Sequence, residues 1–286
     1  MAESKNDLNL RWLGVAGLVI GYDGKVIVQD PYLSHQNYKD VKKEYEFWKQ
    51  KKIDEVLLTH GHFDHSKDIS EVLNRYNART FMNADVSKRR DLIKHQDKIV
   101  GLDKESSEYE ISPKIKLTAL RNAHVKYDLP LVSETFGKIL KNKTLLSKEF
   151  YQNVFLYPSK TPYVYNLNLD NKFNLVTLGS LALNQRNKDL LKEKGIDLLC
   201  LPVQGRSDII EQAEALVTDM RPKGVYLYHW DDFYPPLSKH VDISRLVENL
   251  KKKDFIEKVY VPRLGKNIRV EVPQKRHSRK MEGSLR

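Results

Sequence analysis

The chain has 286 residues, of which 40% are hydrophobic and 30% are charged, and its formal net charge is +11. This length allows one large domain or two small ones, and this composition excludes disorder over long stretches. The single cysteine, Cys200, excludes a disulfide within the chain, and its apolar surroundings predict a buried thiol in a reducing compartment. The first residues lack the apolar core of a signal peptide, and the apolar run 13–21 is too short to span a bilayer. We therefore expect a cytoplasmic protein.

The positive charge does not identify a partner. The lysines are spread along the chain, and acidic residues are interleaved with most of them, which is typical of a solvated surface. A positive surface also attracts nucleic acid, anionic lipid or phosphorylated metabolites. Residues 274–286 show no apolar periodicity and are predicted to form a flexible basic tail. The oligomeric state stays open.

The first elements in chain order are strands. The apolar runs 12–20 and 25–29 flank a turn that contains Gly21 and Gly24, which predicts a β-hairpin. A short apolar strand is expected over 55–59. The next expected elements are a helix over 66–77, a strand over 79–83, a helix over 84–96 and an alternating strand over 114–123.

Helices alternate with strands in the second half of the chain. The expected elements are two strands within 161–180, helix–strand pairs over 187–203 and 208–229, a helix over 241–253, and strands over 257–262 and 267–272. Residues 126–152 interrupt this rhythm and predict an inserted lid of loops and a short helix. The mixture predicts two packed sheets with helices outside, an α/β sandwich that forms a single domain over 1–273.

A cluster of metal-binding residue types follows the strand 55–59. The segment "THGHFDH" contains His60, His62, Asp64 and His65. A loop at the carboxyl end of a buried strand is where an α/β protein builds its site. Gly61 is expected to allow a sharp bend, so that His60 and His62 meet one ion while Asp64 and His65 face a second. Asp64 also suits the N-cap of the next helix. Imidazole nitrogens and carboxylate oxygens are zinc ligands, so we predict a metal site.

The segment resembles the Thr-His-x-His-x-Asp-His signature of the metallo-β-lactamase superfamily. The resemblance covers residues 11–235: the stretch 11–31 looks like the opening hairpin of that family, which ends in an aspartate, here Asp30. "LRNAHV" supplies His124 and "VYLYHWDDF" supplies His229. The resemblance implies a four-layer αββα sandwich of the metallo-β-lactamase type.

The resemblance also implies the metal ligands. His60, His62 and His124 would hold one divalent ion, and Asp64, His65 and His229 would hold a second. Zinc is the expected metal, with manganese or iron as alternatives. Asp30 would lie beneath the metal loop and orient the ligands through hydrogen bonds. The remaining histidines are interpreted as surface residues; they are His35, His95, His240 and His277.

The chain departs from the family pattern at Ser180. Most dinuclear members carry there an aspartate that bridges the two ions, whereas a serine hydroxyl is neutral and a weak ligand. The number of bound ions, one or two, therefore stays open. The stretches "GSLA" and "HWDDF" look most similar to uncharacterised bacterial members, so Ser180 is interpreted as a feature of this subgroup beside the ligands. Asp231 or Asp232 would compensate for the missing bridge, or would form a polar loop after the strand.

The expected chemistry is hydrolysis. A bound divalent ion lowers the pKa of water to about 7 and polarises a carbonyl or phosphoryl oxygen. Neither a GxSxG nucleophile motif nor a phosphate-binding GxxxxGK[ST] loop occurs in the sequence, so metal-activated water is the expected nucleophile, with Asp64 as the catalytic residue that orients it.

Within the superfamily, the sequence resembles the branch that includes ascorbate-phosphate lactonases, phospholipase-D-like phosphodiesterases and RNase Z. This resemblance implies cleavage of a phosphodiester or a lactone-type ester in a small, anionic substrate. Lys126 and Arg206 are candidate phosphate-binding cations, or solvated surface charges. Two alternatives remain: an RNA-processing nuclease, which only the net charge favours, and a non-catalytic metal-binding or redox protein, which the missing bridge keeps open.

Overall fold

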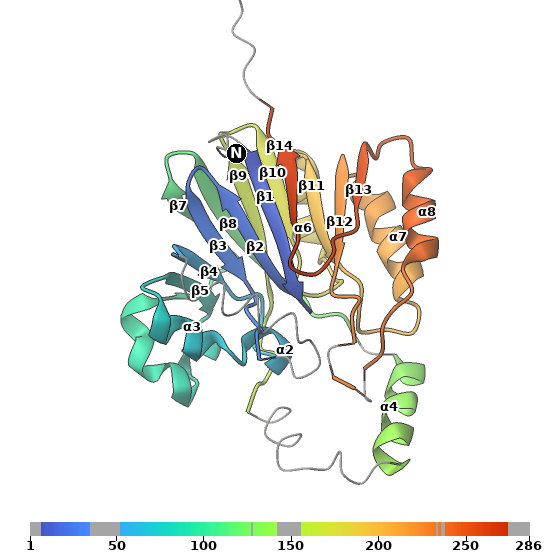
Figure 1. Ribbon diagram of the computed structural model, residues 1–286, viewed down its shortest axis with the longest axis horizontal. Helices are drawn as coiled ribbons and strands as arrows, with labels where there is room; N and C mark the ends of the chain where they lie inside the picture. Colours follow the sequence, from blue (N-terminus) through green and yellow to red (C-terminus); the bar gives the residue numbers. More distant parts are fainter. Residues whose placement is uncertain are drawn as a thin grey trace, which may run out of the picture.

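The protein was analysed as a computed structural model that describes residues 7–34, 52–126, 128–141, 156–232, 234–235 and 238–273. The described strands form two seven-stranded sheets (Figure 1). The first sheet has the order β14 (Asn267–Glu271), β1 (Asp7–Gly14), β2 (Gly17–Tyr22), β3 (Lys25–Gln29), β4 (Glu55–Leu57), β5 (Arg79–Asn83) and β6 (Ile99–Leu102). The second has the order β13 (Lys258–Tyr260), β12 (Gly224–Tyr228), β11 (Leu198–Pro202), β10 (Phe173–Thr177), β9 (Tyr163–Leu169), β8 (Ile115–Arg121) and β7 (Ser106–Ser112).

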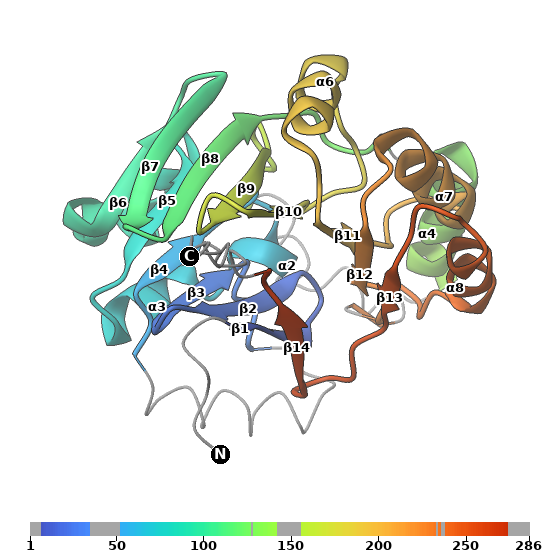
Figure 2. The same cartoon turned by 90° about the horizontal axis from the view of Figure 1, so that it is seen from above.

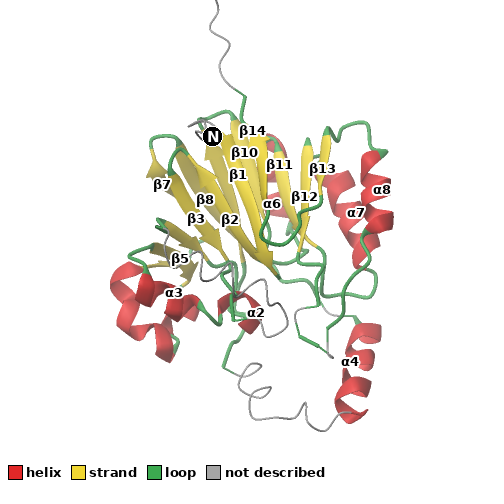
Figure 3. Ribbon diagram, in the orientation of Figure 1, coloured by secondary structure: helices red, strands yellow, loops and turns green. Residues whose placement is uncertain are grey.

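The helices lie on the outer faces of the sheets and at one end of the sandwich (Figures 2 and 3). They are α2 (Phe63–Ser66), α3 (Ile69–Arg75), the 3₁₀-helices η1 (Val86–Lys88) and η2 (Arg90–Lys98), α4 (Leu129–Lys141), α6 (Gln185–Lys194), α7 (Ile209–Met220) and α8 (Ser244–Lys251). In this part of the chain no helix has the length and apolar character needed to cross a membrane.

Three apolar clusters separate the layers. The central cluster joins the inner faces of the two sheets, for example through Leu18 and Tyr165. A second cluster packs α6, α7 and α8 on the outer face of the second sheet, and a third packs α3 and η2 on the outer face of the first. These layers confirm the expected αββα sandwich. Cys200 is fully buried in the central cluster, as expected.

The apolar run 12–20 is not one strand. Strand β1 ends at Gly14 and β2 begins at Gly17, so a tight turn interrupts the run. Val15 lies in this turn at φ 49°, which is rare for a β-branched residue. The turn was missed because its glycines, Gly14 and Gly17, stand within a continuous apolar run that contains no Asn, Asp or Pro. The expected hairpin instead joins β2 to β3 through Asp23 and Gly24, both at positive φ.

Other elements differ from expectation where polar residues dominate. Strands β6 and β7 were not expected, because "SSEYEIS" in the edge strand β7 carries little apolar alternation. The segment 84–96 forms 3₁₀-helices instead of an α-helix. His95 is 5% exposed, so its interpretation as a surface residue is wrong. His35, His277, the expected tail 274–286 and residues 127 and 142–152 of the expected lid lie outside the described residues.

The topology brings the chemistry to one end of the sandwich. Strands β3, β4 and β5 are parallel, and so are β10, β11 and β12. Parallel strands end at the same edge of a sheet, so the segments that follow β3, β4, β10 and β12 meet there. These segments carry Asp30, the histidine loop, Ser180 and His229. Helices α2 and α4 lie at this end (Figure 1).

Candidate metal centre

The loop after β4 is fixed by contacts with two other segments. The Gly61 backbone N–H donates to the carbonyl of Ser159 over 2.8 Å, and the Ser66 hydroxyl donates to the carbonyl of Gly61, also over 2.8 Å. Arg89 donates to the Ser66 hydroxyl and carbonyl over 2.7 and 2.9 Å. The loop therefore holds its histidines from both sides before any ligand binds.

Two local expectations for this loop are corrected. Gly61 is not among the described residues with positive φ; a Cβ at this position would lie 2.2 Å from the carbonyl oxygen of Pro158. The requirement for glycine is therefore close packing, not a sharp bend. His62, not Asp64, is the N-cap of α2, and Asp64 lies in its first turn. Asp64 is 7% exposed and points into the site, where it meets two histidines.

The six expected ligands fall into the two expected groups. The side-chain donor atoms of His60, His62 and His124 all lie within 4.8 Å of one another, and so do those of Asp64, His65 and His229. The Oδ2 atom of Asp64 is 3.6 Å from Nε2 of His65 and 3.6 Å from Nε2 of His229. The two groups adjoin, because the His60 and His65 rings have centroids 3.9 Å apart.

Asp30 lies beneath the loop and is fully buried. Its Oδ1 accepts the Thr59 backbone N–H over 2.7 Å, and its Oδ2 accepts the Thr59 hydroxyl over 2.6 Å. The same Oδ2 is 2.8 Å from Nδ1 of His65. Asp30 itself adopts φ 43°, and such strain in a non-glycine residue is frequent at functional sites.

Ser180 contacts the segment that carries His124. Its hydroxyl oxygen accepts the backbone N–H of Val125 over 2.9 Å. The neighbouring Gly179 is tightly enclosed, because a Cβ there would lie 1.9 Å from the hydroxyl oxygen of Thr59. The turn 179–180 therefore packs on Thr59. The Thr59 hydroxyl also donates to Asp30 and lies 3.0 Å from Nδ1 of His60.

Asp231 contacts His229 from behind. Its Oδ1 is 4.0 Å from Nδ1 of His229, and its Oδ2 accepts the backbone N–H of Val15 over 2.9 Å. Asp231 lies in the loop after β12, as one of the two interpretations expected, but it is buried, with 2% of the residue exposed. It belongs to neither group of donors, so it is not assigned as a replacement for the bridging aspartate. Asp232 instead accepts the hydroxyl of Ser238.

The charges of the site suit cation binding. Burial, with the nearby His65 and His62 charges, holds the pKa of His60 well below its usual range, and burial lowers the pKa of His62 to about 4. Burial also lowers the pKa of His124. Burial would raise the pKa of Asp64, but the neighbouring His65 and His229 outweigh it and lower that pKa. At neutral pH the first group therefore offers the neutral imidazoles of His60, His62 and His124, and Asp64 offers an ionised carboxylate, the states that bind metals.

His65 has the opposite shift. Burial would lower its pKa, but Asp64 and Asp30 on its two sides raise it. A cation beside Nε2 would take the place of the extra proton, while Asp30 keeps the contact with Nδ1. The three-nitrogen group and the mixed nitrogen–oxygen group both match the ligand types of zinc and related divalent ions. The residues therefore fit one or two such ions.

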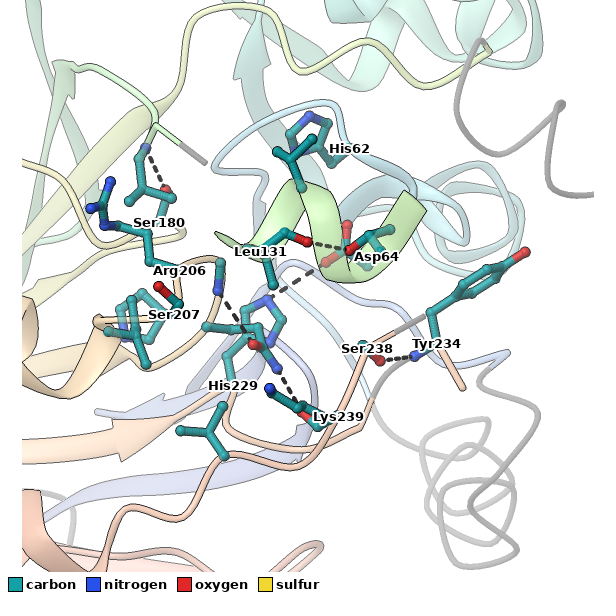
Figure 4. Close-up of a pocket in the computed structure, with 18 of the residues that line it drawn as sticks. His62, Asp64, Leu131, Ser180, Arg206, Ser207, His229, Tyr234, Ser238 and Lys239 are labelled. Carbon is teal, nitrogen blue, oxygen red and sulfur yellow. Dashed lines mark hydrogen bonds and ion pairs between the residues drawn. The ribbon is translucent and has the colours of Figure 1, made fainter. Parts of the chain in front are cut away.

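A pocket of about 590 Å³ opens directly over the two groups of donors. Figure 4 shows His62, Asp64 and His229 in this pocket together with Leu131, Arg206 and Lys239. Arg206, an expected anion-binding cation, donates to Asp208 over 2.6 Å. Lys126 does not line this pocket but lines a second one of about 560 Å³ on the other side of His124. One wall is formed by α4, which lies in the expected insertion 126–152.

Comparison with known proteins agrees with this architecture. Residues 9–229 match the family model described as the β-lactamase superfamily domain. A metal-dependent hydrolase from Polaromonas sp. is 24% identical over 77% of this chain and 76% of its own length. A metal-dependent hydrolase from Bacillus cytotoxicus is 37% identical over 25% of this chain, but the match spans only 29% of that relative.

The solved structure of Igni18, a metallo hydrolase from the archaeon Ignicoccus hospitalis, superposes with a TM-score of 0.67. The alignment covers 93% of this chain and all of that one at 19% identity, so this likeness shows the fold alone. The family match spans most of the chain and ends at His229. The chain therefore belongs to the β-lactamase superfamily domain family, and its sandwich is the metallo-β-lactamase fold.

Proposed function

We propose that the chain hydrolyses a phosphodiester or a lactone-type ester bond in a small, anionic substrate. The broader class, a metal-dependent hydrolase of the metallo-β-lactamase superfamily, follows from the family match and from the donor groups. One observation carries the proposal: six buried or half-buried donors from three separate segments converge at the base of a pocket large enough for a small molecule.

We assign the first ion to His60, His62 and His124 and the second to Asp64, His65 and His229. Divalent ions bound there, zinc most readily, would supply an activated water and would polarise the bond under attack. Asp64 is proposed as the catalytic residue, because its carboxylate faces the pocket and can accept a hydrogen bond from the attacking water. His65 is fixed from behind by Asp30, and Ser180 holds the segment that carries His124.

The anionic character of the substrate is supported by the second pocket. Lys126 is exposed there beside His124, and Lys188 and Arg206 line the same space. Asp219 pairs with Lys188 over 2.7 Å, and Asp208 pairs with Arg206, so part of this charge is neutralised. Lys126 is therefore the residue that we assign to the anionic group.

The proposal is tested with purified, metal-loaded protein on a panel of lactones, para-nitrophenyl esters, bis-para-nitrophenyl phosphate and RNA. Turnover of a small ester or phosphodiester that is lost in Asp64→Ala is expected. His240→Ala is the matched control, because His240 lines the pocket but lies in neither donor group. Cleavage of RNA alone would replace the proposal with a nuclease, and metal binding without any turnover would replace it with a metal-binding protein.

A further inference from the structure

We propose that the pocket over the donor groups binds an unbranched aliphatic chain, so that the substrate is an ester or phosphodiester with an acyl or alkyl tail. This inference rests on the proposed function, because it names the substrate class of the same site. It comes from the walls of the pocket, which are distinct from its base.

Helix α4 forms one wall. Glu134 and Lys138 of this helix line the pocket together with a set of mostly apolar residues at helical spacing, which are Leu131, Val132, Thr135, Phe136 and Ile139. Val132 and Phe136 are 51% and 60% exposed. Apolar groups exposed together beside a reactive centre mark a surface that a ligand covers.

The opposite wall is also apolar. Ile209 and Ile210 at the start of α7 line the pocket, as do Val125 after β8 and Val241 before α8. Pockets of 300–1,000 Å³ with apolar walls and a few polar groups at one end are typical of small-molecule sites. Here the polar end is the pair of donor groups, so an apolar tail would extend away from the reacting bond.

The charged residues in these walls pair with one another. Glu134 of α4 accepts from Lys138 over 3.1 Å and from Lys239 over 3.0 Å. Arg206 pairs with Asp208. An entering tail would therefore meet charges that are already paired, with Lys138 and Lys239 sharing the carboxylate of Glu134, and apolar side chains between them, which is unfavourable for a strongly charged tail.

The wall formed by α4 is joined to the sandwich. Asp128, next to the first residue of α4, accepts the backbone N–H of Ser207 over 3.2 Å and also its hydroxyl. The Glu134–Lys239 pair ties the middle of the helix to the segment after β12. The apolar face of α4 is therefore held at the pocket by contacts that do not involve the donor groups.

The second pocket provides a place for the anionic head group of a substrate whose apolar tail lies in the first pocket. The two pockets share His124, Val125 and Arg206, so they meet at the first donor group. A substrate with its anionic head near Lys126 and its tail along α4 would place the bond between them beside the ions.

The test uses the metal-loaded full chain and two matched series, para-nitrophenyl esters and alkyl para-nitrophenyl phosphates, with chains from two to eight carbons (a length range chosen as roughly what such a pocket holds). We expect kcat/KM to rise by about threefold per added methylene in one of the series. Phe136→Asp is expected to remove this dependence. Leu129→Asp is the matched control: Leu129 is 84% exposed on the same helix but does not line the pocket.

Binding of octanoate and butyrate, measured by calorimetry, separates this inference from the proposed function. Tighter binding of octanoate that Phe136→Asp abolishes supports the tail pocket even if no compound is turned over, in which case only the hydrolase proposal fails. Turnover that is indifferent to chain length, with equal binding of the two acids, would overturn the inference. Equal losses of the chain-length dependence in Leu129→Asp and Phe136→Asp would overturn it too, because the effect would then come from a charge on the surface of α4 and not from the pocket wall.

Discussion

The carboxylate of Asp30 lies 2.8 Å from Nδ1 of His65 and also accepts two hydrogen bonds from Thr59. Because Oδ2 of Asp30 lies beside Nδ1, it can accept the hydrogen of that ring nitrogen, which leaves Nε2 of His65 toward Asp64 and the second group. One buried residue thus orients the ring of a proposed ligand and holds the start of the loop that carries His60, His62 and Asp64.

Asp30→Asn is expected to weaken metal binding by roughly 10–100-fold, the usual effect of removing a hydrogen-bond partner of a ligand. The amide would present a donor to groups that need an acceptor. Metal affinity is measured by competition with a chromophoric chelator. Asp254→Asn is the control, because the Asp254 side chain is 89% exposed. Equal affinities of Asp30→Asn and the native protein would show that Asp30 does not orient His65.

Gly179→Ala is expected to destabilise the protein and to reduce activity. Its Cβ would lie 1.9 Å from the Thr59 hydroxyl oxygen, so the residue that holds Asp30 and His60 would have to move. Overpacking of this kind costs about 1–3 kcal/mol of unfolding free energy, which urea denaturation would measure.

Gly137→Ala is the matched glycine control. Among the described residues nothing lies within 4 Å of a Cβ at this position in α4, so the change is expected to stabilise the helix by about 0.5–1 kcal/mol. Equal behaviour of the two variants would contradict the packing assigned to the turn 179–180.

Asp231→Ala tests the contact behind His229. Removal of the carboxylate leaves the Val15 backbone N–H without this acceptor, which is expected to lower the unfolding free energy by about 1–3 kcal/mol. Metal at the second group is expected to bind about tenfold more weakly, because His229 loses a neighbour 4.0 Å from its Nδ1. Asp232→Ala, measured in parallel, is expected to change the affinity little. Unchanged affinity and stability in Asp231→Ala would remove its positioning role.

Much of the fold could be predicted from the sequence because apolar spacing reports burial. The strand 79–83 was expected with the bounds it has, and the helix–strand pairs around α6 and α7 follow the expected order. The misses have physical causes. The chain turns at Val15 inside a continuous apolar run, where only Gly14 and Gly17 indicate a turn. The edge strand β7 pairs with β8 and contributes only Tyr109 and Ile111 to the central cluster.

The donors of the site could be predicted because the histidine signature is dense and its spacing is specific. The residues that hold these donors in place could not be predicted. The contact of Asp231 with Val15 joins residues 216 positions apart, and the close approach of Gly61 to Pro158 depends on a remote segment. From the sequence, α4 has the pattern of an ordinary amphipathic helix. Only the fold shows that its apolar face lies over the donor groups.

The decisive measurement is elemental analysis of the purified protein beside His62→Ala. At least one equivalent of a divalent transition metal per native chain is expected, with a marked loss of metal in His62→Ala and loss of any hydrolytic activity with it. A native protein that is active without metal, or a His62→Ala protein that keeps the full metal content and activity, would show that the two groups of donors do not form a catalytic metal centre.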